Sequence, residues 1–231
     1  VGGVRRSALI SLSNLSDQRI RTAKTGDWWT TNPERALANN SVAYTEKPDP
    51  GIFMKEWLSL YESKSGERGI FSRASAQKKA AENGRRESNW DFGTNPCSEI
   101  ILRPNQFCNL TEIVVRAGDT VNTLTRKIKV ATLLGTIQST FTNFGYLRKV
   151  WQDNTEEERL LGVSLTGIMD SELLNGKESG LAKTLETLKK VAVECNKEYA
   201  EKFNINQSTA ITCVKPSGTV SQLVDSASGI H

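Results

Sequence analysis

An amide, a thiol and a carboxylate stand at alternate positions in the stretch NPCSEI, as Asn95, Cys97 and Glu99. In an extended segment successive side chains point to opposite faces, so these three would project to the same side. A surface loop with solvated Asn and Glu would also explain the composition. However, residues 90–109 form a long loop with two prolines and two thiols, and long loops tend to be functional. We therefore interpret the stretch as a reaction site.

Two further segments combine adaptable backbone with groups that can hold an anion. Residues 215–222, KPSGTVSQ, follow an apolar run, and a Ser-Gly-Thr turn between a strand and a helix offers N–H groups and hydroxyls to phosphate. Taken alone, ordinary helix capping is the favoured interpretation of this turn. Residues 2–8, GGVRRSA, join two glycines to two arginines whose planar forks suit phosphates or base edges. Taken alone, they favour a hairpin turn with exposed arginines.

The bulk properties limit the class of protein. The chain has 231 residues, of which 37% are hydrophobic and 24% charged, values that suit a folded globular protein. The net charge is +4, and no basic stripe interleaved with aromatic residues is present, which argues against nucleic-acid binding. No apolar run approaches the roughly 18 residues that cross a bilayer, so no membrane role is expected.

The cysteine and histidine content argues against a metal site and in favour of a reactive thiol. None of the four cysteines forms a CxxC pair or a Cys/His cluster, and the one histidine is His231. The chain starts at Val1 without a charged and then apolar leader, so we expect a cytoplasmic protein with reduced thiols. The abrupt ends, VGGVRR and SASGIH, predict a piece of something longer.

Short apolar runs alternate with longer runs of helical period, which is typical of an α/β architecture. We expect strands at residues 7–13, 40–44, 160–165 and 209–214, the last of them buried on both faces. We expect helices at residues 51–63 after Pro50, 73–83 before Gly84, 121–141 after a cap at Asp119 or Thr120, and 181–203. Thr155 and Glu158 have the spacing of a capping box for a helix that begins there.

Two helices carry clear apolar stripes. The stripe of the helix at 121–141 consists of Leu124, Ile128, Ala131 and Leu134, and that of the helix at 181–203 consists of Leu185, Leu188, Ala192, Cys195 and Tyr199. Cys195 is thus expected to act as a small hydrophobic residue in a helix seam. For Cys213, inside an expected strand, packing is also favoured over chemistry. No linker that would divide the chain into two domains is apparent.

The three chemical segments, in this order, resemble ribonucleotide reductase over essentially the whole chain. The NPCxE form is similar to the adenosylcobalamin-dependent class II enzymes, and CNLTEI is more similar to their monomeric, triphosphate-reducing branch. The resemblance implies part of a ten-stranded α/β barrel with a central finger loop. It also implies that residues 1–231 are the central part of this single catalytic domain, with both ends incomplete.

The resemblance implies a role for each segment in reducing ribonucleotides to deoxyribonucleotides. Cys97 would carry the thiyl radical that takes the 3′ hydrogen, Glu99 would accept the 3′ hydroxyl proton, and Asn95 would hold the substrate. Cys108 would be one half of the dithiol that ends as a disulfide, with its partner outside this chain. The remaining roles are substrate phosphate binding and the specificity loop, assigned to Ser217, Gly218, Thr219 and Val220 and to Gly2, Gly3 and Arg5 respectively.

The implied cofactor is adenosylcobalamin, and no protein-built metal site is expected. The implied partners are a ribonucleoside tri- or diphosphate, a deoxynucleotide effector and a thioredoxin-like reductant. Two alternatives remain open. The chain could be a non-catalytic piece of a split reductase that works only when assembled with its missing parts. A glycyl-radical acyltransferase on the related barrel is the other, but it leaves the Asn-x-Cys-x-Glu triplet unexplained.

Overall fold

The computed structural model describes residues 9–177 and 179–229. The described residues form two compact units, which meet in the sequence between Pro104 and Asn105. The expectation of one barrel domain over residues 1–231 stays a prediction. Within the described residues no helix combines the length and the apolar character needed to cross a membrane.

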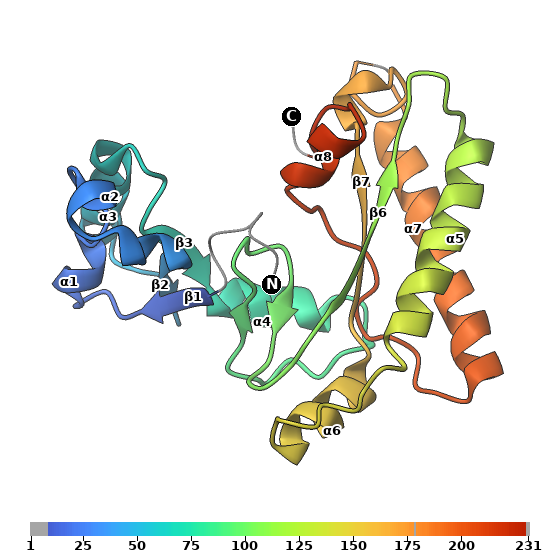
Figure 1. Ribbon diagram of the computed structural model, residues 1–231, viewed down its shortest axis with the longest axis horizontal. Helices are drawn as coiled ribbons and strands as arrows, with labels where there is room; N and C mark the ends of the chain where they lie inside the picture. Colours follow the sequence, from blue (N-terminus) through green and yellow to red (C-terminus); the bar gives the residue numbers. More distant parts are fainter. Residues whose placement is uncertain (1–8, 178, 230–231) are drawn as a thin grey trace. The chain divides into compact units, whose positions relative to one another are not determined.

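The first unit is built on a parallel sheet with the strand order β1-β2-β3 (Figure 1). These strands are β1 (Leu9–Ser13), β2 (Ala38–Tyr44) and β3 (Gly69–Ser72). Parallel neighbours require crossover connections, which here contain α1 (Gln18–Arg21), α2 (Trp28–Thr31), a 3₁₀ turn (Pro33–Leu37) and α3 (Pro50–Ser63). The expected strands at 7–13 and 40–44 are confirmed within the described residues, the second starting two residues earlier.

Local sequence signals explain where the helices of this unit begin. Asp49 caps α3 by accepting hydrogen bonds from the N–H groups of Gly51 and Ile52, and Pro50 occupies the first helical position. Ser72 caps α4 (Arg73–Ala81) in the same way through its hydroxyl. A small antiparallel pair, β4 (Gly93–Thr94) and β5 (Ile101–Leu102), follows.

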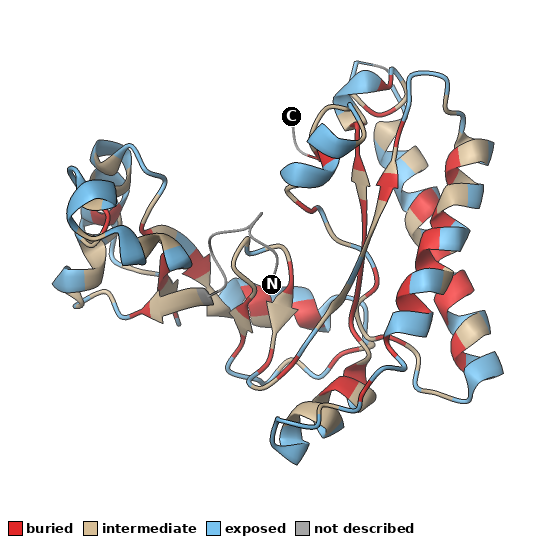
Figure 2. Cartoon of the chain, in the orientation of Figure 1, coloured by how far each residue is buried: buried red, intermediate tan, exposed pale blue. Residues whose placement is uncertain are grey.

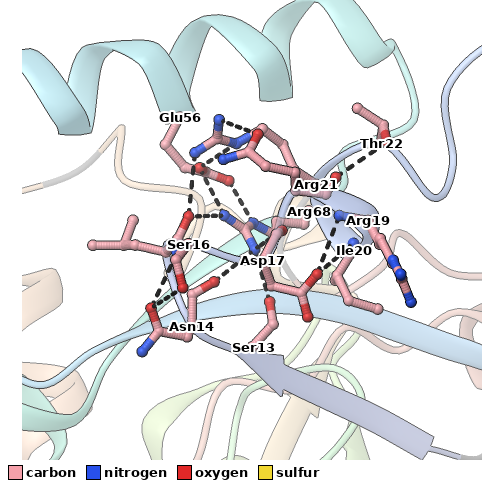
Figure 3. A network of polar contacts seen from close by, with 12 residues as sticks. Ser13, Asn14, Ser16, Asp17, Arg19, Ile20, Arg21, Thr22, Glu56 and Arg68 are labelled. Carbon is pink, nitrogen blue, oxygen red and sulfur yellow. Dashed lines mark hydrogen bonds and ion pairs between the residues drawn. The ribbon is translucent and has the colours of Figure 1, made fainter.

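A buried ionic network ties α3 to the loop after β1 (Figure 3). The carboxylate of Glu56 accepts hydrogen bonds from Arg68 Nε at 2.6 Å and Nη2 at 2.9 Å, and from Arg21 Nε at 3.0 Å. Arg68 also donates to the carbonyl oxygens of Asn14 at 3.0 Å and Asp17 at 3.1 Å. Both Glu56 and Arg68 are buried, so the loop and the helix are held together by groups that cannot be satisfied by water.

The second unit contains the parallel pair β6 (Asn109–Val114) and β7 (Leu161–Thr166), with α5 (Val121–Gln138) and α7 (Leu181–Phe203) against one face (Figure 1). Figure 2 shows that buried residues gather on the two strands and on the facing sides of the helices. The core consists of Ile113, Val115, Leu124, Ile128, Ala131, Leu161, Val163, Leu174, Leu188, Ala192 and Ile211. The expected helix at 181–203 is confirmed at both ends, and Thr120 caps α5 as expected.

Several expectations about this unit are wrong. Residues 209–214 run beside β7 with backbone hydrogen bonds such as that from the Cys213 N–H to the Val163 carbonyl at 3.1 Å, but they form only an isolated bridge, at Thr212. Because Val214 is 65% exposed, the segment is not a strand buried on both faces. Thr155 and Glu158 lie in the last turn of α6 (Lys149–Glu158) and start no helix. Leu134 and Leu185 are exposed although the apolar patterns include them. In α5 the buried positions around Leu134 are Thr132, Gly135 and Thr136, which an apolar pattern does not mark.

Candidate active site

Asn95 to Ser98 form the turn that joins β4 to β5. The Ser98 N–H donates to the Asn95 carbonyl at 2.9 Å, and Ser98 has a φ of +64°, the left-handed conformation of a tight turn. The side-chain carbonyl of Asn95 accepts from the Ile100 N–H at 3.1 Å. The segment is thus not extended, and the argument from alternating faces does not apply to it.

The turn presents Cys97 and Glu99 from a hairpin that is anchored to the sheet of the first unit. Asn39 on β2 donates its side-chain N–H to the Pro96 carbonyl at 2.6 Å. Arg86, buried beside the Phe92 ring, donates to the Ile101 carbonyl at 2.9 Å. Cys97 is half-buried, and both carboxylate oxygens of Glu99 are buried. The hairpin therefore holds a partly accessible thiol two residues from a shielded carboxylate.

Cys108 lies directly before β6 in the second unit. The next residue, Asn109, fixes the start of the strand because its N–H and its side-chain amide both donate to the Leu160 carbonyl, at 2.9 and 3.2 Å. The ring of Phe107 packs against Phe144 and Trp151, with centroids 4.9 and 4.8 Å apart. Cys108 is half-buried and carries a thiol rather than a disulfide. Its position is thus rigidly set by its two neighbours.

The turn at residues 215–218 lies at the carboxyl end of β6 and β7 and leads into α8 (Thr219–Leu223). The Lys215 N–H donates to the hydroxyl of Ser164 on β7 at 3.0 Å, and the Ser217 hydroxyl donates to the carboxylate of Glu112 on β6. A Cβ on Gly229 would stand 2.3 Å from the Lys215 carbonyl oxygen, so only glycine allows the chain to pass so close behind the turn. Side chains of both strands therefore hold the turn.

Gly218 gives the turn its open side. It has a φ of +50°, and a Cβ built on it would meet no atom within 4 Å. Within the described residues, no hydrogen bond uses the N–H groups of Gly218 and Thr219, whereas the Val220 N–H donates to the Ser217 carbonyl at 3.1 Å. Two backbone donors, from Gly218 and Thr219, are thus available beside vacant space, as an anion-binding turn requires.

The segment after α8 returns to the same end of the sheet. Thr166 donates its hydroxyl to the Ala227 carbonyl at 3.0 Å, and the Asp170 carboxylate accepts from the Ala227 N–H at 2.8 Å. Arg116 donates to the Asp225 carbonyl at 2.7 Å. These bonds attach the short helix to both strand ends, so that the turn is fixed on each side.

The remaining predicted residues are Cys195, Cys213 and the glycines and arginine of the N-terminal segment. Cys195 is 5% exposed on α7, and burial, followed by the nearby Glu198 charge, raises the pKa of its thiol. The expected seam position of Cys195 is confirmed. Cys213 is only half-buried. Gly2, Gly3 and Arg5 lie outside the described residues.

Sequence reasoning missed Glu112 and Ser164. They face each other in the register of β6 and β7 and each accepts a hydrogen bond from the turn. The available signal was a polar residue in the strand segment CNLTEI, which by itself does not reveal a partner far along the chain.

Models of known protein families give no match to the chain. Curated relatives do match it over its full length. A protein of Lacticaseibacillus paracasei is 29% identical over an alignment of 262 positions that covers 100% of this chain and 33% of that protein. Proteins of Lactobacillus gasseri and Lactobacillus leichmannii are 28% and 26% identical, and each alignment covers 100% of this chain and 34% of the relative. All three are named adenosylcobalamin-dependent ribonucleoside-triphosphate reductase.

The chain is similar in sequence to these ribonucleotide reductases over its whole length. The expected resemblance to adenosylcobalamin-dependent ribonucleotide reductases is thereby confirmed for the chain as a whole. The chain spans about a third of the length of these reductases.

Solved structures give the same picture for the fold. A crystal structure of a B12-dependent, class II ribonucleotide reductase superposes with a TM-score of 0.72 and 24% identity, covering 96% of this chain and 34% of that one. The α subunit of the class Id ribonucleotide reductase of Actinobacillus ureae superposes with a TM-score of 0.62 and 15% identity, covering 95% and 48%. The α/β architecture with parallel strands is therefore shared with reductases of two classes.

Proposed function

We propose that this chain is the central part of the catalytic α/β barrel of an adenosylcobalamin-dependent ribonucleotide reductase. In this proposal a ten-stranded barrel encloses the hairpin of β4 and β5 as its finger loop. The observation that carries the proposal is the similarity of the whole chain to curated reductases, at up to 29% identity in the alignments given above. The reaction is the reduction of ribonucleoside tri- or diphosphates to 2′-deoxyribonucleotides in the cytoplasm.

Cys97 carries the thiyl radical in this proposal. The sulfur takes the 3′ hydrogen atom of the ribose, so that an S–H bond forms as the C3′–H bond breaks. Glu99 then accepts the proton of the 3′ hydroxyl group, and Asn95 holds the substrate oxygens. The position of Glu99 two residues from Cys97, with both carboxylate oxygens buried, supports a role in proton transfer beside the reacting thiol.

The cofactor fits one feature of the hairpin. Cys97 is half-buried in the turn between two short strands, so it is not enclosed in the core of the first unit. Adenosylcobalamin, when bound, would supply the radical that the thiol needs. We assign none of the described residues to the cobalamin itself.

In this proposal, residues of the second unit supply the reducing electrons and bind the substrate phosphates. Cys108 supplies electrons together with a second thiol outside this chain, and a thioredoxin-like protein reduces the resulting disulfide. Ser217, Gly218, Thr219 and Val220 receive the substrate phosphates. The open side of Gly218 and the available N–H groups of Gly218 and Thr219 support this role. Gly2, Gly3 and Arg5 belong to the loop that responds to a deoxynucleotide effector.

The test is nucleotide reduction by a polypeptide that contains this chain together with the flanking parts of the proposed reductase. Adenosylcobalamin and a dithiol are supplied. Both a ribonucleoside triphosphate and a diphosphate are supplied, because the chain does not distinguish them. Cys97→Ser should abolish product, whereas Cys195→Ser, a substitution in the helix seam, should retain most of the activity. Activity of the Cys97→Ser variant would overturn the proposal.

A second possibility is that the chain is active only when it assembles with separate flanking parts of a reductase, and this can be tested. Since the chain spans about a third of the curated reductases, the 231-residue chain by itself is expected to be inactive. Mixing it with separately expressed flanking parts of a reductase should restore turnover if the parts assemble.

A further inference from the structure

Asn39 joins β2 to the turn that carries Cys97. Its side-chain N–H donates to the Pro96 carbonyl at 2.6 Å, although the two residues lie 57 positions apart in the sequence. The bond connects different elements, because Asn39 is the second residue of β2 and Pro96 lies in the turn between β4 and β5. It therefore fixes the tip of this hairpin relative to the parallel sheet.

The acceptor of this bond belongs to the peptide group that leads into Cys97. The carbonyl oxygen of Pro96, the N–H of Cys97 and the Cα of Cys97 lie in one planar unit. A hydrogen bond to that oxygen restricts the orientation of the plane, and the proline ring restricts the φ torsion that precedes it. The place from which the Cys97 side chain projects thus depends directly on Asn39.

The tip needs such an attachment because the strand ladder below it is short. β4 and β5 pair at two positions, and the pair nearer the tip is Thr94 with Ile101. The next bond toward the tip, from the Asn95 N–H to the Ile100 carbonyl, is long at 3.4 Å. A two-stranded hairpin is at best marginally stable by itself in water. Contacts with the sheet must therefore set the geometry of this one.

The base of the hairpin is attached to the sheet in a different way. Phe92 belongs to a buried apolar cluster with Phe71 of β3, and Leu12, Ala43 and Ile101 pack against that cluster. This packing does not involve Asn39. It should therefore keep the hairpin on the sheet when the hydrogen bond to Pro96 is lost, so that only the tip is released.

The adjacent residue, Asn40, provides an internal comparison. Successive side chains of a strand point to opposite faces, and Asn40 donates its side-chain N–H to the Glu67 carboxylate at 3.1 Å. Asn40 is buried, whereas Asn39 is half-buried. A general effect on folding should therefore be at least as large at Asn40, while an effect on the Cys97 turn should arise only at Asn39.

We propose that Asn39 is a positioning residue, whose hydrogen bond to the Pro96 carbonyl holds the Cys97 thiol where it can take the 3′ hydrogen atom of the ribose. The inference rests on the proposed function for the chemistry of Cys97, but the position of the thiol can be measured without it. Asn39 itself makes no contact with the substrate in this proposal. A displacement of about 1 Å at a reacting group can cost on the order of a hundredfold in rate, so a single hydrogen bond to the turn can matter.

The first measurement follows the thiol itself, in a polypeptide that contains this chain with the flanking parts of the proposed reductase. The folded protein is treated with iodoacetamide, and peptide mass spectrometry gives the alkylation rate of Cys97 relative to that of Cys213, which is also half-buried. Asn39→Ala should raise this ratio roughly two- to tenfold, because the released turn exposes the thiol more often. Asn39→Leu, which keeps the side-chain size without the donor, should do the same. Asn40→Ala should leave the ratio unchanged.

The second measurement is nucleotide reduction by the same variants. Asn39→Ala should lower kcat roughly ten- to hundredfold and change KM by less than about twofold, because substrate contacts remain while hydrogen transfer slows. Asn40→Ala should lower the melting temperature at least as much as Asn39→Ala and keep the kcat of the parent polypeptide.

Two outcomes would overturn the proposal. One is an alkylation ratio that stays at the parent value in both Asn39 variants, because the turn would then be held without this bond. The other is an equal loss of kcat in Asn39→Ala and Asn40→Ala, which would indicate a general effect on folding. If the parent makes no deoxynucleotide, the proposed function fails, and the alkylation ratio alone decides whether Asn39 sets the position of the thiol.

Discussion

The hydroxyl of Ser217 donates a hydrogen bond to the carboxylate of Glu112, which lies 105 positions earlier in the chain on β6. This bond fixes the turn at residues 215–218, but it also directs the only proton of that hydroxyl away from a ligand. In the proposed reductase, substrate phosphates at this turn would therefore rely on backbone N–H groups. They would also lie near the negative charge of Glu112, which opposes their binding.

Glu112→Gln is expected to tighten binding of nucleotides. The amide keeps an acceptor for the Ser217 hydroxyl while the charge is removed, and charges several Å apart near a protein surface interact by on the order of 1 to 3 kcal/mol. Equilibrium binding of a ribonucleoside triphosphate should improve roughly 5- to 100-fold, and binding of the uncharged nucleoside should not change.

The control for this experiment is Glu186→Gln, which removes an exposed acidic group 3.7 Å from Lys189 on α7. It should leave both affinities unchanged. If Glu112→Gln altered nucleoside and nucleotide binding equally, Glu112 would act on the shape of the turn and not on the phosphate charge.

Gly218→Val is expected to weaken nucleotide binding by blocking the open side of the turn. No protein atom lies within 4 Å of the added Cβ, so the branched side chain would fill space reserved for the ligand. Losing one charge-assisted hydrogen bond costs about 1.5 to 3 kcal/mol, roughly a ten- to hundredfold rise in the dissociation constant. The measurement compares nucleotide with unphosphorylated nucleoside.

The backbone of Gly218 requires a matched control. Because its φ is +50°, any other residue costs backbone energy, and Asn tolerates this conformation better than valine. Gly218→Asn therefore separates backbone strain from loss of space when melting temperatures are measured alongside. If valine lowers only the melting temperature, or weakens both ligands alike, the turn is a structural cap.

Cys108→Ser is expected to stop repeated turnover without preventing radical formation. In the proposed mechanism Cys108 provides electrons and Cys97 provides the radical, so their losses should differ. With a small reductant, the Cys108→Ser variant should make at most about one product per enzyme, while cobalt–carbon bond homolysis stays detectable by spectroscopy. Sustained turnover by this variant would exclude Cys108 from the redox pair.

The helices were predictable where local signals agree. Pro50 after Asp49 marks the start of α3, and the apolar period of residues 181–203 gives α7 both of its ends. The spacing of Thr155 and Glu158 predicted a helix start that is not there, because these two residues lie in the last turn of α6. The run at 209–214 wrongly predicted a strand buried on both faces, since apolar composition does not reveal that Val214 is exposed. Burial depends on what packs nearby, which a short pattern does not contain.

In the candidate site, too, residue types could be predicted from the sequence but long-range contacts could not. The residues Asn95, Cys97 and Glu99 stand out by type, but their turn is set by the positive φ of Ser98 and the hydrogen bond from Ile100 to Asn95. Glu112 was not predictable, because its importance arises from Ser217, a residue brought to it by the strand order. Short-range chemistry can be read from a sequence, whereas a contact across 105 positions requires the fold.

Glu56→Ala is expected to destabilise the first unit strongly. Glu56 is 1% exposed and accepts hydrogen bonds from both Arg68 and Arg21, so its removal leaves the buried Arg68 guanidinium without its counter-charge. Breaking a buried pair from one side costs about 3 to 5 kcal/mol. Urea denaturation should show this loss in the free energy of unfolding. Glu82→Gln, at an exposed pair with Lys79, should change it by less than about 0.5 kcal/mol.

The pH dependence of this stability has a definite sign. Burial by itself would raise the pKa of Glu56, but the hydrogen bonds and charges of Arg68 and Arg21 outweigh it and hold the pKa below its usual value. A group with a lowered pKa in the folded state stabilises the fold above the unfolded value of about 4.3 and loses that contribution as the pH falls. The difference in unfolding free energy between the parent and Glu56→Gln should therefore be constant from about pH 7 to 5 and shrink below about pH 4. A difference that stayed constant down to pH 3, in a parent that is still folded there, would mean that the charge of Glu56 contributes nothing and that the network acts through its neutral hydrogen bonds alone.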